Sequence, residues 1–336
     1  MAATPMAVNN QALRSWDCLV GDFLALRQGG QAVALVTLVR SHGGSPRPVG
    51  SQMVVSAAGE YAGHLTGGCA EAVIVEEATA ALAEGRNRTL RLGAGSAYLD
   101  IELPCGAAVE LYIDVGVKDS AVQAVQQSLS ERQVVALDTL EDGRHKVVRE
   151  PGSQAPVSGF RRWYYPQRRL LVYGKGPNAY TLARLAVESD FHVFLHSPDP
   201  STLAACEGTV TDTVRLTSPG AVSPPPLDPY SAAVLMFHEH DWEPALLTQL
   251  LRTQCFYLGA LGSRRTHQRR CEQLVAEGFA EAPERIHGPV GLDIGAANPV
   301  EIALSILAEV IQDYRRAQGS RPVLRWSESR AVSAAS

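Results

Sequence analysis

Residues 170–179 read Leu-Leu-Val-Tyr-Gly-Lys-Gly-Pro-Asn-Ala, and they are the strongest indication of how the second half of the chain folds. Its apolar start predicts a buried strand, and the G-x-G-x-x-A spacing is typical of a strand–turn–helix that binds dinucleotides. Gly174 permits the tight turn, Gly176 lets the backbone approach a pyrophosphate, and Ala179 allows close packing of helix on strand. Free amides at the helix start, where Asn178 stands, attract an anion. We therefore expect a Rossmann-like domain with a phosphate site at this turn.

Beyond this turn, strands alternate with helices. Strands are expected at residues 170–173, 191–196, 232–237 and 256–258, and helices at residues 177–188, 242–252, 264–277 and 299–315. Such alternation is typical of parallel βαβ units.

The first half has a different pattern, which predicts a small α+β domain. Helices are expected at residues 12–27 and 70–84, and strands at residues 32–39, 52–56, 61–65, 89–92, 109–115 and in a pair within 131–149. The expected fold class is therefore α/β, with an N-terminal α+β domain followed by a Rossmann-like domain with a mainly parallel sheet. Residues 151–159 are rich in Pro, Gly and Ser and indicate the boundary. The expected division is an N-terminal domain at 10–150, a linker at 151–167, a Rossmann-like domain at 168–316 and a tail at 317–336.

Composition excludes several classes of protein. The 336 residues agree with two domains at roughly 150 residues each. The chain has 30 basic and 35 acidic residues, and a net charge of −5 argues against nucleic-acid or membrane attachment by bulk charge. The longest apolar runs, residues 32–36 and 232–237, are far shorter than the ~20 residues of a membrane helix, and residues 1–10 do not resemble a secretion signal. Because the six cysteines form no C-x-x-C pair, we expect a reduced, cytoplasmic protein in which single thiols matter.

A glycine-rich loop presents one of these thiols. Gly67 and Gly68 free the backbone to present consecutive amides, and Cys69 stands at the start of the helix expected at 70–84. There the helix dipole favours the thiolate, which makes Cys69 the best candidate for a reactive thiol. The carboxylate of Glu71 opposes a thiolate but also suits a helix start, and Gly67, Gly68, Cys69 and Glu71 are together candidate residues for cofactor binding. The alternative is an inert, buried cysteine behind a structural glycine turn.

Two further segments of the first half belong with this loop. Ser45 and Arg47 lie in the sequence Ser-Pro-Arg-Pro-Val-Gly, and an arginine beside the loop can bind phosphate bidentately. The Cys105-Gly106 turn precedes the strand at 109–115 and has a structural role by spacing alone.

A second strand–glycine–helix segment, residues 259–266, has the sequence Gly-Ala-Leu-Gly-Ser-Arg-Arg-Thr. Gly262 allows the turn, Ser263 caps the helix, and Arg264 and Arg265 are placed to meet phosphate. A solvated helix face explains these arginines equally well.

Two histidines follow the strand at 232–237. His238 and His240 share a face if the chain is extended there, which permits metal ligation. No third ligand follows at a recognisable spacing, so no metal is expected and a polar crevice wall is favoured. Asp241 is placed to cap the next helix.

The acid that reads the ribose in dinucleotide-binding domains normally ends the second strand. This chain has His196 and Ser197 at that place, and Asp199 follows behind a proline, so its direction stays open. A Rossmann-like domain that binds a dinucleotide and one that no longer does are both consistent with the sequence.

Together these segments resemble the XdhC/CoxI family, accessory proteins that mature molybdenum hydroxylases such as xanthine dehydrogenase. The resemblance rests on residues 44–50, 67–71, 105–106, 174–179, 259–267 and 287–295. The chain departs from the family pattern at Ala107, where a second glycine is frequent, and at Ser197, where an acid is expected.

The resemblance implies a maturation chaperone rather than a catalyst. It implies binding of molybdopterin cofactor, or of its cytosine dinucleotide form, and protection of that cofactor. A cysteine desulfurase would supply sulfur to replace an oxo ligand, and the cofactor would pass to a molybdenum hydroxylase apoenzyme. The family pattern also implies a homodimer. Our leading hypothesis for such a chaperone has Cys69 as the reactive thiol near the molybdenum.

Two alternatives come from other functional classes. The Rossmann-like half could serve an NAD(P)-dependent oxidoreductase, although no acid–base pair stands beside the glycine turn. Alternatively, Cys69 could carry a persulfide in a sulfurtransferase.

Overall fold

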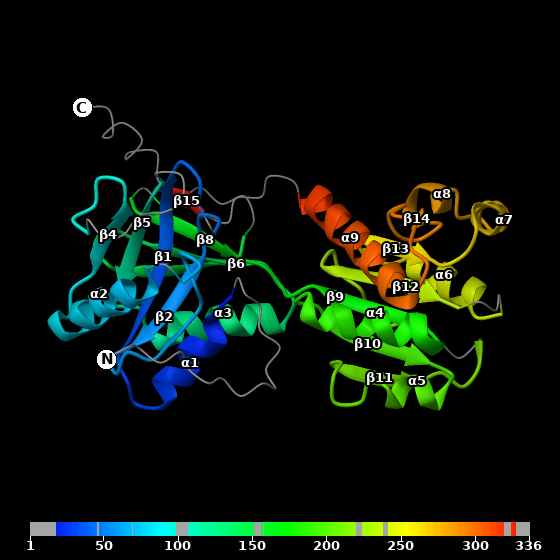
Figure 1. The fold of residues 1–336 in the computed structure, drawn as a ribbon, viewed down its shortest axis with the longest axis horizontal. Helices are drawn as coiled ribbons and strands as arrows, with labels where there is room; N and C mark the ends of the chain where they lie inside the picture. The colour runs from blue at the N-terminus through cyan, green and yellow to red at the C-terminus, as the bar shows by residue number, and fades with distance from the viewer. Residues whose placement is uncertain are drawn as a thin grey trace. The chain divides into compact units, whose positions relative to one another are not determined.

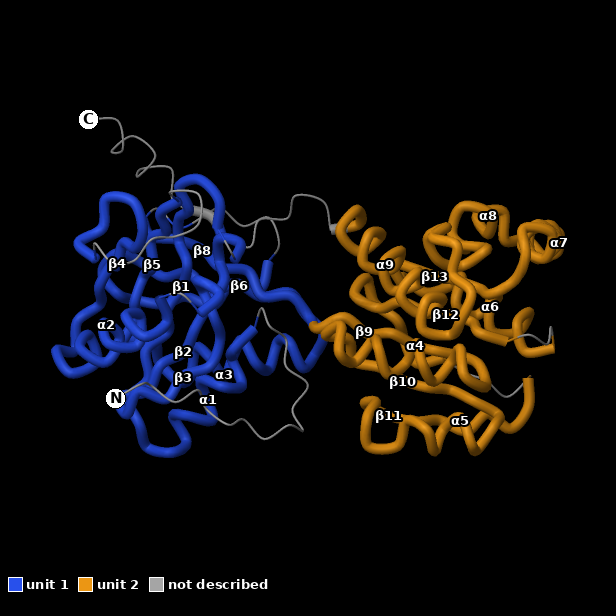
Figure 2. The backbone as a smooth tube through the Cα atoms, viewed as in Figure 1, with its two compact units in different colours: residues 1–166, 322–336 blue, residues 167–321 orange. Residues whose placement is uncertain are grey.

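The structure is a computed structural model that describes residues 18–45, 47–68, 70–98, 107–150, 156, 158–219, 224–237, 241–318 and 324–326. The chain forms two compact units (Figure 2). Unit 1 comprises residues 1–166 and 322–336, and unit 2 comprises residues 167–321. In sequence, unit 2 is therefore inserted between two segments of unit 1.

Unit 1 contains a five-stranded antiparallel sheet with the order β3-β2-β1-β5-β4 (Figure 1). The strands are β1 (Val33–His42), β2 (Gln52–Ser56), β3 (Tyr61–Ala62), β4 (Arg88–Gly93) and β5 (Ala108–Asp114). The helix α2 (Glu71–Glu84) contributes Ile74 and Ala78 to a buried apolar cluster with Val36 and Leu111 of the sheet. The strands and the helix expected here are confirmed, but β3 ends at Ala62 instead of residue 65. Gly63 turns the chain there with a φ of +89°, and a Cβ at this position would lie 2.7 Å from the Gln52 carbonyl oxygen.

A second antiparallel sheet of unit 1 has the order β15-β8-β6-β7. The strands are β6 (Val135–Thr139), β7 (His145–Val148), β8 (Phe160–Tyr164) and β15 (Leu324–Trp326). Two helices, α1 (Val20–Gln28) and α3 (Asp119–Ser130), join it around an apolar cluster that includes Phe23, Val125 and Leu137. The strand pair expected within 131–149 is confirmed as β6 and β7. The helix α3 is not predicted from the sequence, because its buried residues are only Val122, Val125 and Ser128.

Two strands of this sheet lie in segments to which the sequence assigns other roles. β8 falls within the expected linker, 151–167, and β15 within the expected tail, 317–336. β15 pairs with β8 through Leu324 opposite Arg162 and Trp326 opposite Phe160. Because this pairing joins residues far apart in sequence, no local pattern reveals it.

Unit 2 contains a six-stranded sheet in which every pair of neighbours is parallel, with the order β11-β10-β9-β12-β13-β14. The strands are β9 (Arg169–Gly174), β10 (His192–Ser197), β11 (Asp212–Arg215), β12 (Ser231–Met236), β13 (Tyr257–Ala260) and β14 (Ile286–His287). This is the strand order of dinucleotide-binding Rossmann domains, and the order reverses between β9 and β12. The expected α/β fold class with a parallel sheet is confirmed. The short strands β11 and β14 are additional to the four that the sequence predicts.

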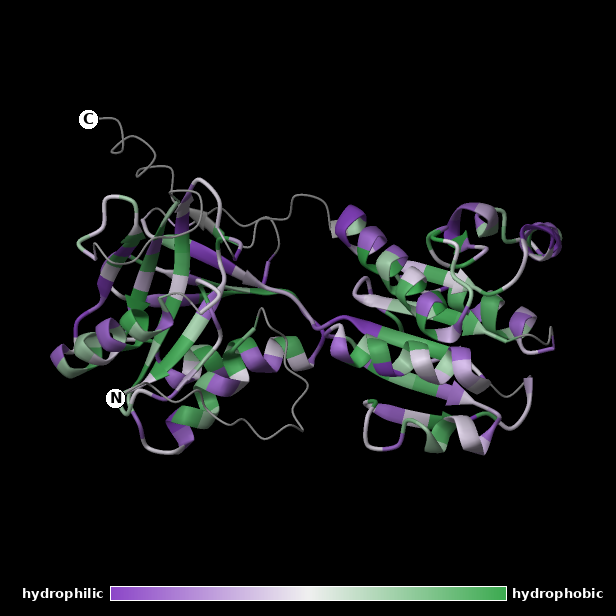
Figure 3. Ribbon diagram, viewed as in Figure 1, coloured by the Kyte–Doolittle hydropathy of each residue, from purple (hydrophilic) through white to green (hydrophobic). Residues whose placement is uncertain are grey.

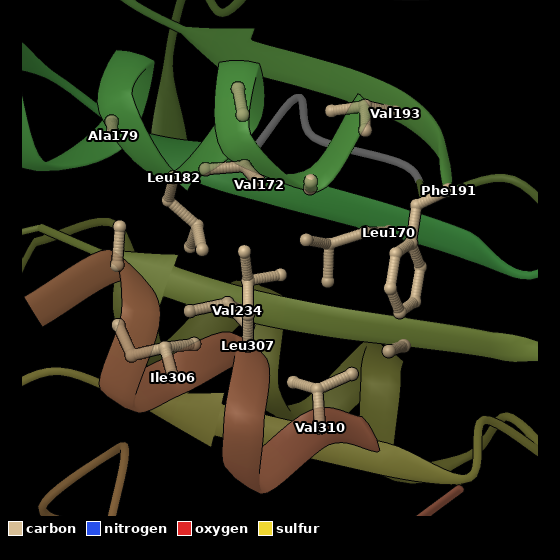
Figure 4. Close-up of a cluster of buried hydrophobic side chains, with 14 of the residues drawn as sticks. Leu170, Val172, Ala179, Leu182, Phe191, Val193, Val234, Ile306, Leu307 and Val310 are labelled. Atoms are coloured by element: carbon tan, nitrogen blue, oxygen red, sulfur yellow. The ribbon is translucent and has the colours of Figure 1, made fainter. Parts of the chain in front are cut away.

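Helices cover both faces of the parallel sheet. The helices α4 (Gly176–Glu188) and α9 (Pro299–Gln318) share one apolar cluster with the sheet, in which Leu182 and Leu307 lie near Val172 and Val234 (Figure 4). The other face carries α6 (Glu243–Leu251), α7 (Arg264–Ala276) and the short α8 (Ala282–Arg285), and α5 (Pro200–Ala204) follows β10. Figure 3 shows that the central strands of this sheet are hydrophobic along most of their length, as expected for strands covered on both faces.

The switch in strand order requires a glycine at the end of β9. Gly174 lies opposite Met236 of β12, and a Cβ on Gly174 would lie 2.7 Å from the Met236 Cβ. The two strands therefore approach closely at the point where the strand order reverses. In open α/β sheets, this is the point at which ligands normally bind. In the part of the chain that the structure describes, no helix is long and apolar enough to cross a membrane.

Candidate functional site

A buried carboxylate organises the loop that precedes α2. Glu71 is 4% exposed, and its Oε1 accepts hydrogen bonds from the Leu65 amide at 3.1 Å and the Thr66 amide at 2.8 Å. Its Oε2 accepts from the Thr66 hydroxyl at 2.6 Å, the Gly68 amide at 2.8 Å and the Ala70 amide at 3.3 Å. Burial raises the pKa of the Glu71 carboxyl, but the hydrogen bonds from Thr66 and the loop amides outweigh it, and the pKa lies below its usual value. Glu71 is therefore an ionised anchor for the loop.

The candidate thiol belongs in sequence to this loop. Cys69 itself is outside the described residues, but both of its neighbours in the chain, Gly68 and Ala70, donate to Glu71. Gly67 and Gly68 have φ values of +74° and +101°, which favour glycine. The sequence predicts that both amides face a ligand, whereas the structure directs the Gly68 amide at Glu71.

The three N-terminal motifs contribute to one apolar core. Each motif contributes an apolar side chain to the cluster between the sheet and α2. These side chains are Val49 of the Ser45–Gly50 segment, Leu65 and Ala70 beside the glycine loop, and Ala107. Ala107 follows the Cys105-Gly106 turn, which lies outside the described residues.

The Ser45–Gly50 segment carries a buried hydroxyl that bears on ligand binding. The Ser45 hydroxyl is buried and has no hydrogen-bond partner among the described residues. Buried polar groups are normally hydrogen-bonded, so this oxygen marks a place where a ligand can supply a partner.

In unit 2, the glycine turn opens onto a pocket. The pocket has a volume of about 460 Å³ and is lined by Lys175, Asn178, Asp199 and Pro299 as well as the turn itself. Gly176 begins α4, and its amide donates at 2.8 Å to the Thr202 hydroxyl. The Gly176 amide, which the sequence pattern places near phosphate, therefore already donates a hydrogen bond within the protein.

Asp199, whose direction the sequence leaves open, lies beside this turn. Its Oδ2 accepts from the Thr202 hydroxyl at 2.6 Å, so a single hydroxyl separates the carboxylate from the Gly176 amide. Asp199 also caps α5 by accepting from the amides of Ser201 and Thr202. The hydrogen bonds from Thr202 and Ser201 lower the pKa of Asp199 to about 2, so a negative charge borders the pocket throughout the neutral range.

The second glycine segment adopts the expected cap. Ser263 is the N-cap of α7, and its hydroxyl accepts from the Thr266 amide at 3.2 Å. Gly262 has a φ of +142° and lies against Thr266. Arg264 and Arg265 are exposed and form no hydrogen bond or ion pair with the described residues.

The histidines considered for metal binding, His238 and His240, lie outside the described residues. Among the residues that are described, no group of three or more His, Cys, Asp or Glu side chains is arranged to hold a metal ion. The prediction that Asp241 caps α6 is wrong, because Trp242 occupies the N-cap position.

The carboxylate that holds the loop after β14 is not predicted from the sequence. Glu309 of α9 accepts hydrogen bonds from the Tyr257 hydroxyl and from the Gly291 amide, the latter at 2.8 Å. His287 stacks on Tyr257 with 4.4 Å between the ring centroids, and its Nε2 lies 2.8 Å from Asp313 Oδ2. The motif at 287–295 is thus anchored to α9. The only sign of this anchor in the sequence is the i,i+4 spacing of the acids Glu309 and Asp313 on that helix.

A buried histidine, His196, stands where the ribose-reading acid is expected. His196 stacks on Tyr173 with 4.5 Å between the centroids, and neither the His196 Nε2 nor the Tyr173 hydroxyl has a hydrogen-bond partner among the described residues. Burial lowers the pKa of His196 to about 4, despite the nearby charge of Asp212. The imidazole is therefore neutral at physiological pH.

Because of this histidine, we expect the stability of unit 2 to decrease in acid. Between pH 6.5 and about 4 the unfolded chain binds a proton at His196 that the folded unit does not, so stability falls as the pH is lowered, by up to about 3 kcal/mol. Urea unfolding of unit 2 across this range measures the slope. His196→Phe is expected to flatten it, whereas His42→Phe in unit 1 leaves it unchanged. A slope that persists in His196→Phe would assign the effect to another group.

Comparison with known proteins gives concordant results. Residues 26–93 match the XdhC and CoxI family, and residues 170–310 match the XdhC Rossmann domain. The chain is 32% identical over 284 residues to the molybdenum cofactor insertion chaperone PaoD of Escherichia coli (strain K12), covering 84% of this chain and 83% of PaoD. It is 26% identical over 324 residues to a protein of Bacillus subtilis (strain 168) named as a probable xanthine dehydrogenase subunit, covering 87% of this chain and 96% of the other.

The fold also has a solved counterpart. A crystal structure described as a xanthine dehydrogenase from Bacillus halodurans superposes with a TM-score of 0.74 at 21% identity, covering 90% of this chain and 97% of the other. The family resemblance noted from the motifs is thus confirmed over both halves of the sequence. The chain belongs to the XdhC and CoxI family.

Proposed function

We propose that this protein is a chaperone that binds molybdenum cofactor as its cargo, protects it and inserts it into a molybdenum hydroxylase of the xanthine dehydrogenase type. The observation that carries the proposal is the 32% identity, along 84% of the chain, to a relative named as a molybdenum cofactor insertion chaperone. The relative named as a probable xanthine dehydrogenase subunit supports the class of client.

In unit 1, Ser45, Arg47 and the glycine loop would hold the molybdopterin part of the cargo. The buried Ser45 hydroxyl has no partner among the described residues and fits a ligand rich in acceptors. A guanidinium such as that of Arg47 binds phosphate in bidentate geometry. Glu71 accepts a hydrogen bond from the Gly68 amide and so fixes the loop that contains Gly67 and Gly68. Because its carboxylate is used for this purpose, Glu71 would position the loop rather than bind the cargo directly.

Cys69 would be the thiol near the molybdenum. In the sequence Cys69 stands two residues before α2, where the helix dipole favours the thiolate, and the thiolate is the form that binds metals and reacts. We further propose that the loop would hold the cargo during exchange of an oxo ligand for sulfido. The sulfur would come from the persulfide of a cysteine desulfurase, two electrons from a thiol reductant would bring it to the sulfido level, and the oxo oxygen would leave with two protons as water. We also propose that the protein acts as a homodimer.

In unit 2, the pocket at the glycine turn would hold phosphate or the nucleotide part of a cytosine dinucleotide form. Gly174 and Ala179 shape this turn. The Gly176 amide is already bonded to Thr202, so phosphate would instead meet the side of the pocket that is formed by Lys175 and Asn178. Gly262, Ser263, Arg264 and Arg265 would form a second phosphate contact at the start of α7.

Cofactor retention tests the proposal at Cys69. The protein is purified from cells that make molybdopterin and oxidised, and the released pterin is measured by fluorescence. Cys69→Ala is expected to fold normally but to retain at least about tenfold less pterin, because a ligand next to the metal is lost. Cys18→Ala, a partly exposed thiol elsewhere in unit 1, is the matched control and should retain as much as the unmodified chain.

Equal pterin on Cys69→Ala would remove the thiol from the cargo site. Absence of pterin from all three proteins would favour a second candidate, an NAD(P)-dependent oxidoreductase, for which the Asp199 carboxylate at the glycine turn is the specific observation. A carboxylate there favours a free ribose diol over a 2′-phosphate, so NAD should then bind more tightly than NADP. For the sulfurtransferase alternative, mass spectrometry after desulfurase treatment should detect added sulfur on Cys69.

A further inference from the structure

A pocket between α6 and α7 adjoins the start of α7 through Thr266, but none of its other lining residues is used above. Its volume is about 220 Å³, and its apolar lining includes Pro244 and Leu247 of α6 and Leu274 of α7. Its polar lining includes Arg269 and Arg270. It shares no lining residue with the pocket at the glycine turn.

The polar wall contains a guanidinium that is incompletely bonded. The Arg270 side chain is only 6% exposed, and it pairs with the equally buried Glu243 through Nε at 3.2 Å and Nη2 at 2.9 Å. Nη2 also donates to the Leu261 carbonyl at 2.8 Å. The remaining nitrogen, Nη1, is buried and has no hydrogen-bond partner among the described residues. A guanidinium has five N–H donors and no acceptor, so Nη1 needs a hydrogen-bond acceptor that the described residues do not supply.

The charge of the pocket favours an anion. Glu243 neutralises Arg270, which leaves the exposed Arg269 as a further cation at the rim, with no ion pair to any residue that the structure describes. α7 also carries the exposed Arg264 and Arg265, and it is among the most hydrophilic helices in Figure 3. The acids nearest in sequence are Glu272 on α7 and Glu277 at its C-cap, and each accepts a hydrogen bond from a glutamine of α7.

We infer that this pocket binds a small organic carboxylate, whose oxygens accept from Arg269 and Arg270 while its short apolar body lies against Leu247 and Leu274. A carboxylate matches the planar fork of a guanidinium. The apolar wall distinguishes such a ligand from inorganic phosphate, which has no apolar part. The inference does not depend on the proposed chaperone function.

Titration of the full-length protein tests the site. The probes are 3-methylbutanoate and benzoate, and binding is followed by calorimetry and by ligand-detected NMR. Both carboxylates are expected to bind, whereas 3-methylbutanamide, which has the same shape without the charge, and inorganic phosphate bind at least about tenfold more weakly.

Two surface variants locate the binding. Arg269→Gln is expected to weaken carboxylate binding about tenfold, and Gln273→Trp is expected to block the pocket, because both residues are exposed and line it. Arg86→Gln removes an equivalent exposed charge from unit 1 and should leave the affinity unchanged. The inference is overturned if neither carboxylate binds, if the neutral amide binds equally well, or if both pocket variants retain full affinity.

Discussion

Replacement of Glu71 with alanine is expected to destabilise unit 1 by at least about 3 kcal/mol and to disorder the loop that carries Cys69. The substitution leaves the amides of Leu65, Thr66 and Gly68 without their acceptor in a buried loop. Urea unfolding followed by circular dichroism gives the loss, and hydrogen exchange across residues 63–84 shows where it occurs.

Glutamine at this position restores less than half of the loss, because its amide group brings donors towards amides that need an acceptor. Glu76→Ala, an exposed acid on the same helix, is the control and should change stability by no more than about 0.5 kcal/mol. Since the folded pKa of Glu71 is lowered, its contribution is complete above the unfolded pKa of 4.5 and is lost as the pH falls below it. If Glu71→Ala were as stable as Glu76→Ala, the loop would be held by other contacts.

Breaking the ion pair between Arg161 and Asp138 is expected to cost about 3–5 kcal/mol in the stability of unit 1. Both side chains are 4% exposed, and they are joined by two hydrogen bonds, at 2.6 and 2.9 Å, between the neighbouring strands β8 and β6. Asp138→Ala leaves a buried guanidinium without its counter-ion. Denaturant unfolding of the single and double variants measures the effect.

The double variant Asp138→Leu with Arg161→Met separates the cost of an unpaired buried charge from the loss of side-chain packing. Removing both charges avoids an unpaired buried ion, so most of the lost stability should return. The exposed pair Arg144–Asp142 serves as a control, and Asp142→Ala should leave unfolding nearly unchanged. If the double variant were as unstable as Asp138→Ala, packing by the arginine stem would account for the loss.

The sequence predicts the sheet of unit 2 better than the details of either site. Long apolar strands and amphipathic helices carry local patterns, so β9, β10, β12 and α4 are found where they are expected. Short elements do not carry such patterns. β11 and β15 have four and three residues, and each exists because a neighbouring strand pairs with it.

The direction of a side chain is equally hard to predict. The position of Asp199 at the glycine turn depends on α5, a five-residue helix that Asp199 itself caps. The sequence identifies Glu71 as a carboxylate beside a thiol, but its role follows from loop amides that converge only after the two glycines adopt positive φ. Such convergence depends on dihedral angles and leaves no periodic trace in the sequence.

The return of the chain to unit 1 has a consequence for biosynthesis. Because β15 adds to β8 after all of unit 2 has been made, the second sheet of unit 1 stays incomplete until residues 324–326 have left the ribosome. Until then, the edge of β8 offers unpaired backbone groups to other nascent chains. Translation that stops before residue 324 would release a polypeptide with this edge still open, and such products are candidates for aggregation and for capture by general folding factors.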